Sequence, residues 1–549
     1  MPPFRILVVA VACLVLPGAL VADDLTETLE QSTSQELWSR FVQAPYTHAK
    51  IPNVSFAGYQ FSERPISQPK VVANVKEAGA KGDGQTDDTG AFRKAIEIAE
   101  QAGGGAILIP AGHYQLSDAL LLSSSHLVLR GEGSGKTILD FARPITETSV
   151  NKMELWRTPK LPSGNAPASW YGGLIWVEPG GPTINPIKAE VNVQPLADAV
   201  PIAASAKQGD FTLVVSAVDA AKLRPLVGKM APVAWTGGRE LALQIAGHES
   251  MREYQWSSYR ELYDGVMTWV WANQIERIDG TNVVFKKPLR LDAQAGRVSI
   301  GTTSPYITEV GIEGLTIQFP LTQYLGHHKE LGYNALLFRR AAHCWVRDVE
   351  VINADNGLIL GGENVNCTVT GFKLSGRDNH HGTMARFMSH DNLFENFRIE
   401  SKPIHGINSE GLSSGNVWRD GTMLYGTFDY HRMMSFDSVR TNITVNNTGG
   451  SGGNGTHGPG VGRRICHWNI RITNGVGKGI AQPAQYSNAA LVGIQGAELD
   501  LRATNLNRMP DGLNKGAVIA DHGSEPVPAD LFEAQLRLRL GGLPAEKAD

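Results

Sequence analysis

The second half of the chain alternates apolar and polar residues in windows that recur about every two dozen positions. The windows begin at Val346, Val369, Phe394, Trp418, Arg440 and His467. The steps between these starts are 23, 25, 24, 22 and 27 residues, and the fourth and sixth residues of a window are usually apolar, Gly421 excepted. Alternation with period two predicts a strand, and this spacing fits one coil of a β-solenoid. Because one coil cannot bury its inner face alone, stacked coils must share a core.

Equivalent residues of successive windows are expected to stack on one another. Asn392 and Asn416 hold the same place in their windows, as do Cys344 and Cys367. Both pairs are interpreted as internal ladders with a structural role rather than as catalytic groups.

Residues 71–140 have a different pattern. An apolar stripe with helical spacing consists of Phe92, Ala95, Ile96 and Ala99. Asp87, Asp88 and Thr89 precede it and are predicted to supply N-cap groups. Short strand-like segments, AILIPAG and HLVLRG, follow the helix. We expect the helix to cap the open end of the strand stack, where unpaired backbone groups would otherwise be exposed.

The repeat is interrupted between residues 150 and 305. Segments 210–235 and 271–291 predict strands of a small inserted β module. Residues 249–271 are rich in aromatic and charged side chains, which fit either the wall or lid of a cleft or the core of the module itself.

Residues 71–140 also carry a specific motif, GAxGDGxTDDTxAFxxAI followed by IPAGxY. The matching positions are Gly79, Ala80, residues 82–84 and 86–89, Ala91, Phe92, Ala95, Ile96, residues 110–112 and Tyr114. This block resembles the opening of the pectate lyase superfamily, in its rhamnogalacturonase- and epimerase-type form. The resemblance implies a right-handed parallel β-helix, as in pectate lyases, polygalacturonases, rhamnogalacturonases, alginate epimerases and phage tailspikes. It does not choose among their activities, because a fold alone does not determine function.

The predicted architecture is therefore all-β: a right-handed parallel β-helix, or β-solenoid, with an N-terminal capping helix and an inserted small β module. The expected divisions are a signal peptide at 1–22, an N-terminal arm at 23–70, the cap helix and first coils at 71–149, the module at 150–305, the main β-helix at 306–505, and a C-terminal coil and tail at 506–549.

The N-terminal segment, the charge and the cysteines indicate where the protein is located and which partners it can have. Arg5, an apolar run and small residues near Ala22 predict a signal peptide and export to the periplasm or the cell exterior. No other segment is apolar for long enough to span a membrane, and a net charge of −4 without a basic stretch argues against nucleic acid. After signal removal, Cys344, Cys367 and Cys466 form neither a disulfide framework nor a CxxC zinc motif. The sequence leaves the oligomeric state open.

The solenoid register places ionisable residues on consecutive coils. Four residues beyond successive windows come Gly357, His380, His405, Asp429 and Ser451. Because neighbouring strands lie about 4.8 Å apart, we expect His380, His405 and Asp429 to occupy three consecutive rungs of a groove. The candidate catalytic residues are His380, His381, His405, Tyr430 and His431. The candidate substrate-binding residues are Arg377, Arg386, Glu410, Asp429 and Arg432.

These residue types suit an anionic polysaccharide substrate. In β-elimination, cationic groups neutralise a uronate carboxylate while a base near neutrality, such as histidine, removes the C5 proton and the O4 oxygen leaves. Arginine suits the carboxylate because it binds bidentately. A lyase is the leading hypothesis, since cationic and aromatic side chains outnumber paired carboxylates at the predicted groove.

Three alternatives stay open. An inverting glycoside hydrolase needs two carboxyl groups roughly 6.5–9.5 Å apart. Asp378 and Asp429 are candidates, because they lie two coils apart, and Glu410 and Asp420 are further candidates. A uronate epimerase would share the proton abstraction, and a polysaccharide-binding or adhesin-like β-helix would have no activity. A polygalacturonase-like enzyme should have an Asp-Asp pair, a Gly-His-Gly segment and an Arg-x-Lys segment, but the histidine segments DNHHG and IHGINSEG contain no Asp-Asp and no clear Arg-x-Lys is present. Pectate lyases usually have acidic calcium sites, and no compact Asp cluster is visible. Ca²⁺ is therefore a candidate ion only, and no cofactor or metal ligand is assigned.

Overall fold

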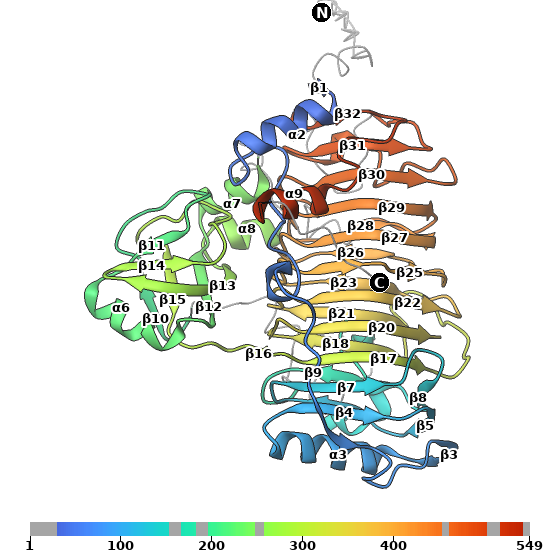
Figure 1. Cartoon of the computed structure of the whole chain (residues 1–549). Coiled ribbons are helices and arrows are strands. Elements are labelled where there is room, and N and C mark those ends of the chain that lie inside the picture. The colour runs from blue at the N-terminus through green and yellow to red at the C-terminus, as the bar shows by residue number, and fades with distance from the viewer. Residues whose placement is uncertain are drawn as a thin grey trace, which may run out of the picture.

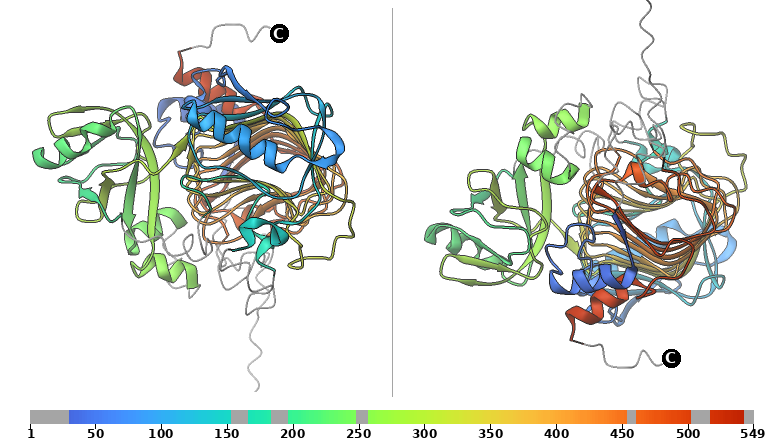
Figure 2. Two further views of the ribbon diagram at one scale, coloured as in Figure 1. Left: turned by 90° about the horizontal axis from the view of Figure 1, so that it is seen from below. Right: turned by 90° about the horizontal axis from the view of Figure 1, so that it is seen from above.

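The structure, a computed structural model, describes residues 30–152, 166–182, 196–247, 257–452, 460–501 and 516–541. Parallel strands are stacked into a right-handed β-helix, and a separate β module lies against one side of it (Figure 1). Seen along the stack, the coils enclose a continuous interior (Figure 2). The predicted signal peptide lies outside the described residues. Among the described residues, no helix is long and apolar enough to cross a membrane.

All six predicted windows begin in strands of the larger sheet of the β-helix. Its strands are β1 (Glu30–Ser32), β2 (Val71–Asn74), β3 (Asp83–Asp87), β4 (Gly105–Ile109), β5 (Gly112–Leu116), β7 (Leu127–Gly131), β8 (Thr137–Phe141), β17 (Gly311–Gln318), β20 (Trp345–Ile352), β22 (Thr368–Ser375), β24 (Leu393–Glu395), β25 (Arg398–Ile399), β27 (Val417–Gly426), β29 (Val439–Asn447), β30 (Cys466–Ile472), β31 (Ala490–Gln495) and β32 (Val518–Ala520). Val346 pairs with Val369, and Trp418 pairs with Arg440, so successive windows stack in parallel as the period predicts. The fold prediction is confirmed.

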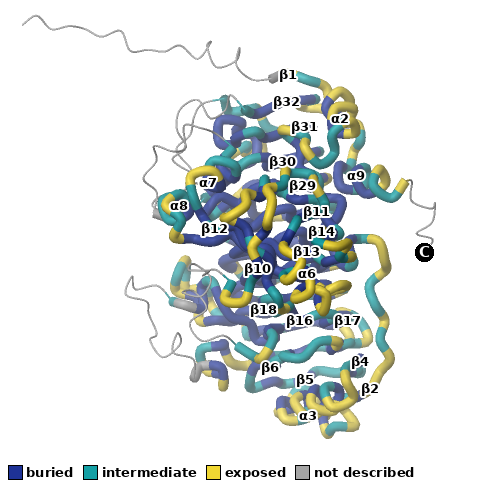
Figure 3. The backbone as a smooth tube through the Cα atoms, turned by 90° about the vertical axis from the view of Figure 1, so that its left-hand side faces the viewer, coloured by how far each residue is buried: buried dark blue, intermediate teal, exposed yellow. Residues whose placement is uncertain are grey.

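A second parallel sheet forms another wall of the coils. Its strands are β6 (Leu120–Leu122), β9 (Ile175–Val177), β18 (Asn334–Arg339), β21 (Asn356–Gly362), β23 (His381–Ala385), β26 (Ile407–Ser409) and β28 (Phe428–Tyr430). A short pair, β16 (Ile307–Thr308) with β19 (Ala341–Ala342), completes the turns between the walls. Buried residues line the inside of the stack, and exposed ones concentrate on the helices and the outer turns (Figure 3).

Polar residues also stack inside the coils. The Asn392 side-chain amide donates to Asn416 Oδ1 at 2.9 Å, and both residues are buried. Cys344 and Cys367 are likewise buried. They lie at equivalent places of successive coils, because the residues that follow them, Trp345 and Thr368, pair with each other. The predicted ladders therefore lie inside the coils, where the buried side-chain amides of Asn392 and Asn416 both have hydrogen-bond partners.

Helix α3 (Thr89–Gln101) covers the N-terminal end of the stack and buries the predicted apolar stripe. Asp87 accepts from the Thr89 backbone N–H, the first of the helix, at 3.0 Å. Asp88 is the N-cap residue, but its side chain makes no capping hydrogen bond, contrary to expectation. Its carboxylate instead accepts from the backbone N–H groups of Lys81 and Gly82, at 2.7 and 2.9 Å, and so fixes the preceding Gly-rich turn.

The N-terminal arm runs along the outside of the whole stack (Figure 1). Helix α2 (Ser34–Gln43) of the arm lies near the C-terminal end of the stack, where β1 pairs in parallel with β32. Helix α9 (Leu531–Arg539), which follows β32 in the chain, lies at the same end. The arm then passes through η1 (Tyr59–Ser62), and the Tyr59 backbone N–H donates to Thr368 Oγ1 at 2.7 Å. Further short 3₁₀ turns are η2 (Ile145–Glu147), η3 (Ser149–Lys152), η4 (Pro167–Ser169), η5 (Arg224–Leu226) and η7 (Pro483–Gln485).

The inserted module is an antiparallel sheet with its own core. It contains β10 (Ala199–Pro201), β11 (Thr212–Val214), β12 (Met230–Thr236), β13 (Thr268–Asp279), β14 (Asn282–Phe285), β15 (Val298–Gly301) and helices α6 (Ala217–Leu223), α7 (Arg239–Ala246) and α8 (Ser257–Tyr263). The expected start at residue 150 is too early, because β9 still pairs with β6 and β18 of the β-helix. In the aromatic segment, Tyr259 and Trp269 are buried in the module core, and Trp269 also donates to the Leu412 carbonyl of the β-helix.

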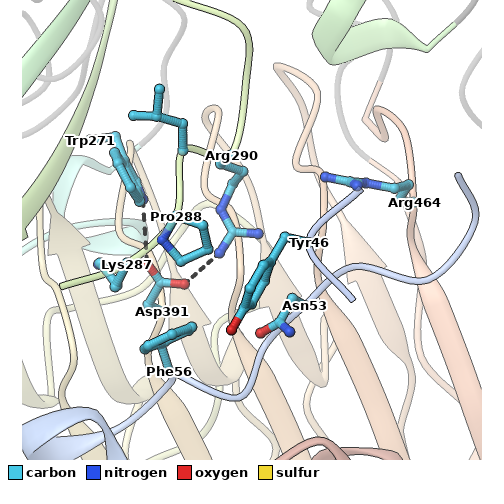
Figure 4. Close-up of a pocket in the computed structure, with 10 residues that line it drawn as sticks. Tyr46, Asn53, Phe56, Trp271, Lys287, Pro288, Arg290, Asp391 and Arg464 are labelled. Atoms are coloured by element: carbon cyan, nitrogen blue, oxygen red, sulfur yellow. Dashed lines mark hydrogen bonds and ion pairs between the residues drawn. The ribbon is translucent and has the colours of Figure 1, made fainter. Parts of the chain in front are cut away.

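A buried charge cluster joins the module to the β-helix (Figure 4). Asp391 contacts Lys287 at 2.7 Å and Arg290 at 2.5 Å, and the three side chains are 1%, 2% and 8% exposed. Although burial favours the neutral carboxyl, these two cations hold the pKa of Asp391 well below its usual range. A small cavity of about 20 Å³ lies beside the cluster. Removing one partner of such a cluster leaves an uncompensated buried charge.

We expect Asp391→Asn to lower the free energy of unfolding by about 3–5 kcal/mol, because buried Lys287 would then lack its carboxylate and Arg290 would keep only its 3.5 Å contact with Asp437. Urea unfolding at pH 7, followed by tryptophan fluorescence, measures the change. Asp279→Asn is the control, since its pair with Arg277 is 56% and 61% exposed and is worth at most about 1 kcal/mol. Equal effects of the two substitutions would contradict the docking role.

Candidate functional site

Six histidines form a continuous cluster at the second sheet. They are His327, His328, His380, His381, His405 and His431. His381 begins β23, His405 comes just before β26, and His431 follows β28. His327 and His328 come from the loop at residues 319–333, between β17 and β18. Ring centroids are 3.9 Å apart for His380 and His381, 5.1 Å for His381 and His405, and 4.8 Å for His405 and His431.

The coil register differs from the predicted one. Asn379 pairs with Pro403 and Thr383 with Ile407, so His381, not His380, lies level with His405. Asp429 pairs with Asn408, not with His405. The difference arises because the connecting turns vary in length between coils. The strands alone do not fix where the next strand begins.

A repeated residue–glycine pair marks the true register. Asn356 pairs with His381, and the glycines that follow these residues and His405 stack in the same order. A Cβ on Gly382 would lie 2.8 Å from the Gly406 carbonyl oxygen, and one on Gly406 would lie 2.2 Å from that of Thr427. Only glycine allows this close approach of coils. The repeated pairs, NG at 356 and HG at 381 and 405, were the signal in the sequence that fixes the register.

Hydrogen bonds hold one ring nitrogen of several histidines. Nδ1 of His381 lies 2.9 Å from Asn356 Oδ1, and Nδ1 of His405 lies 3.0 Å from the Gly450 carbonyl oxygen. Nδ1 of His431 lies 3.0 Å from Asp429 Oδ2. These acceptors select the tautomer with a proton on Nδ1, which leaves a lone pair on Nε2.

Burial and neighbouring charges set the protonation of the cluster. Burial, with further repulsion from the surrounding rings, lowers the pKa of His380 and of His381 well below the ordinary value. The same two effects lower the pKa of His327 to about 4. Burial also opposes the charged form of His431, but the Asp429 carboxylate outweighs it and raises the pKa. The inner rings are therefore neutral at pH 7.

Glu410 joins two arginines beside the histidines. Arg386 Nε lies 2.5 Å from Glu410 Oε1, and Arg432 Nε lies 4.0 Å from Oε2. Despite burial, the two guanidinium groups lower the pKa of Glu410 to about 2. Arg386 is 1% exposed and also donates to the Trp170 carbonyl, so it positions Glu410 rather than facing solvent, whereas Arg432 is 23% exposed.

Tyr430 and Arg377 do not line this surface, contrary to expectation. Tyr430 is in the interior core, where Arg440 donates to its hydroxyl and His467 Nε2 lies 2.9 Å away. It follows Asp429 on the strand, and alternate side chains of a strand point to opposite faces. Arg377 pairs with Asp355 at 2.7 Å, and Asp355 also accepts from backbone N–H groups of the loop at residues 319–333.

Four residues of the site were not identified from the sequence: His327, His328, Glu330 and Asn408. The first three lie in the segment GHHKE, a second paired-histidine motif outside the repeat windows. Glu330 lies 3.2 Å from His380 Nδ1 and accepts a 2.6 Å hydrogen bond from Tyr324, and burial raises its pKa. Asn408 is fully buried beside Asp429, and its amide has no hydrogen-bond partner among the described residues.

The cluster is graded from buried to exposed. His380 and His381 are fully buried, His405 is 5% and His431 13% exposed, and His327 is exposed. Solvent and ligands therefore reach it from the side of His327, His431 and Arg432. The groups of three or more potential metal ligands found among the described residues all contain histidine. Calcium prefers oxygen ligands, so this donor set does not fit Ca²⁺.

The inserted module packs directly behind the site. Phe387, Met388, Leu412, Met433 and Met434 belong to its hydrophobic cluster and follow the site strands along the chain. The module thus supports the segments that carry the arginines, Glu410 and His431. A separate cleft of about 810 Å³ lies between the module and the arm, lined by residues of mixed charge such as Lys286 and Glu309.

We expect Tyr430→Phe to lower the free energy of unfolding by about 2–3 kcal/mol, because buried Arg440 loses a charge-assisted hydrogen bond. Chemical denaturation measures this change. Tyr425→Phe is the control, since Tyr425 is 40% exposed on the neighbouring sheet. If Tyr430→Phe has the same stability as the wild type, its assignment to the core is wrong.

Comparisons with known proteins agree with the fold. Residues 72–165 match the family model described as rhamnogalacturonase A/epimerase, pectate lyase-like. Alginate lyase 7 of Azotobacter vinelandii is 44% identical over 72 residues, which is 12% of this chain and 8% of that protein. Mannuronan C5-epimerase AlgE4 of the same organism is 40% identical over 72 residues, 12% of this chain and 13% of that protein. The chain therefore spans only a small part of these curated relatives.

Among solved structures, the tailspike protein gp49 of Pseudomonas phage LKA1 is 14% identical, with a TM-score of 0.47, over 77% of this chain and 63% of that one. The Family 28 exopolygalacturonase of Yersinia enterocolitica is 12% identical, with a TM-score of 0.31, over 83% of this chain and 78% of that one. The observed coils make this chain a right-handed parallel β-helix, and its residues 72–165 are similar to the pectate lyase-like family.

Proposed function

We propose that this protein is an exported enzyme that cleaves an anionic, uronate-containing polysaccharide by β-elimination. The observation that carries the proposal is the graded cluster, in which partly exposed His431 and Arg432 lie beside buried Asp429 and Glu410. Relatives over the first coils are named an alginate lyase and mannuronan C5-epimerases. Elimination and C5 epimerisation both begin with removal of the C5 proton of a uronate.

His431 is the proposed base. Its Nδ1 is held by Asp429, whose other oxygen accepts from the Gly452 backbone N–H at 2.6 Å. This arrangement fixes the ring and makes Nε2 the proton acceptor of the neutral ring, which forms as the pH rises above the raised pKa of His431. An Asp–His pair of this kind orients the imidazole and stabilises the imidazolium that forms.

Arg432 is the proposed partner of the substrate carboxylate. It lies at the exposed end of the cluster next to His431, and its guanidinium stacks over the Phe387 ring, 5.5 Å from the centroid. A guanidinium can bind a carboxylate bidentately. Neutralising that carboxylate makes the adjacent C5–H more acidic, as elimination requires.

An inverting hydrolase is the second candidate, and Glu330 favours it. Burial raises its pKa, as a general acid requires, while Asp429 stays ionised. Glu330 is a fully buried residue of the loop at residues 319–333, so this reaction also requires that loop to move.

A polymer panel separates these reactions. We expect the purified chain, incubated with alginate, pectate and glycosaminoglycans, to yield products with unsaturated uronate ends from at least one polymer. Mass spectrometry and ultraviolet absorbance measure them. Products that have gained water would identify a hydrolase, and deuterium uptake at C5 without cleavage an epimerase. Binding without any product would contradict an enzymatic role.

Substitutions test the two proposed roles on the polymer that is cleaved. We expect His431→Gln to reduce kcat by about 100-fold or more, since general base catalysis typically contributes that much. Arg432→Gln should raise KM by roughly 10- to 100-fold, through the loss of a charge-assisted hydrogen bond.

Arg398→Gln is the matched control, because Arg398 is a 47% exposed arginine on the other sheet. Unchanged kinetics in His431→Gln would exclude His431 as the base. An equal loss in Arg398→Gln would show that the effect of Arg432 is one of general surface charge.

A further inference from the structure

The inner histidines have an arrangement that polysaccharide binding does not explain. One nitrogen from each of His380, His381 and His405 lies within 4.8 Å of the other two. The first two side chains are completely buried, and the third is 5% exposed. Substrate carboxylates and hydroxyls cannot reach three such rings at once. A small ligand can.

Their hydrogen bonds direct lone pairs inward. Nδ1 of His381 and of His405 is held by an acceptor, and Nδ1 of His380 lies 3.2 Å from a Glu330 oxygen. Nε2 of His380 and of His381 has no hydrogen-bond partner among the described residues. Leaving buried polar atoms unpaired is costly, by about 1–3 kcal/mol for each group. A metal ion that accepts these lone pairs would remove that penalty.

A fourth nitrogen comes from the loop above. Nε2 of His327 lies 3.2 Å from Nε2 of His405. Two imidazole nitrogens on one tetrahedral Zn²⁺, each about 2.0–2.1 Å from the ion, are about 3.3 Å apart. His327 also shares a second group of close ligand atoms with His328 and His380, which extends from the buried rings to the surface.

We propose that His380, His381 and His405 bind one divalent transition-metal ion of the Zn²⁺ class, with His327 at the fourth, outward position. The donor set selects this class, because imidazole nitrogen suits Zn²⁺, Cu²⁺ and Ni²⁺, whereas Mg²⁺ and Ca²⁺ require oxygen. Asn356 and the Gly450 carbonyl are the outer groups that orient the rings of His381 and His405, as acceptors on the second nitrogen do in known metal sites. Glu330 lies 3.2 Å from Nδ1 of His380 without a hydrogen bond to it.

The site lies beside the proposed base, since the His405 and His431 rings are 4.8 Å apart. A bound ion there would supply a Lewis acid for a uronate carboxylate that displaces His327 from the outward position. This catalytic role rests on the proposed function. The binding of the ion does not.

Metal binding is tested on the full chain, free of any histidine tag and treated with a chelator, without polymer. We expect about one equivalent of Zn²⁺ to bind, measured by elemental analysis after dialysis, and a Tm that rises with Zn²⁺ concentration but not with Ca²⁺. Co²⁺ should give the visible absorption of a nitrogen-ligated ion. His380→Gln and His405→Gln should each weaken Zn²⁺ binding by at least about 100-fold. The reason is that loss of an outer group already lowers metal affinity by about 10- to 100-fold, and loss of a ligand should lower it more.

His343→Gln is the matched control. His343 is 7% exposed, its Nε2 also lacks a partner among the described residues, and it is not part of the cluster. It should bind Zn²⁺ like the wild type, and circular dichroism verifies that each variant is folded.

Failure of the wild type to bind Zn²⁺, or equal binding by His405→Gln, would overturn the inference. If the two ligand variants do not fold, the Co²⁺ spectrum and the Zn²⁺-dependent Tm of the wild type still decide it. Zn²⁺ binding without cleavage of any polymer would support the metal site while refuting the proposed function. Cleavage by a protein that binds no Zn²⁺ would do the reverse.

Discussion

Backbone hydrogen bonding between parallel coils is the constraint on which this structure depends. It places equivalent residues of successive coils about 4.8 Å apart, so any residue type that recurs in the sequence becomes a column in space. Inside the coils this produces the Asn392–Asn416 ladder, in which buried amides satisfy each other. At the edge of the second sheet it produces a column of Asn356, His381 and His405, and the same spacing brings imidazole rings into contact.

The site combines two environments that one surface groove would not provide. Its inner rings are buried and neutral, with lone pairs that face one another, which suits an ion more than a sugar. Its outer edge has a charged character, because Asp429 orients His431 and Glu410 lies between Arg386 and Arg432. A uronate needs both a base and a neutralised carboxylate, and the boundary between these environments places such groups next to each other.

The inserted module supports this edge. The module core includes Met388, Leu412 and Met433, which follow directly after the strands of the site. Its attachment depends on Asp391, a buried carboxylate shared by two cations of the module. Rigid support matters because catalytic geometry tolerates little displacement. The loop at residues 319–333 is held differently, through hydrogen bonds from its backbone to Asp355 and an internal hydrogen bond from Tyr324 to Glu330.

The sequence by itself determined the fold, because strand alternation and coil length are local properties that repeat. It also determined which coils carry the histidines. It did not determine their register, since turns of unequal length shift one coil against the next, although the glycines after Asn356, His381 and His405 marked it. Only the tertiary structure decided that Tyr430 points inward to Arg440, because a one-residue step along a strand reverses the face. Only it brought His327 and Glu330 from a loop outside the repeat to His405 and His380, a contact that no local pattern encodes.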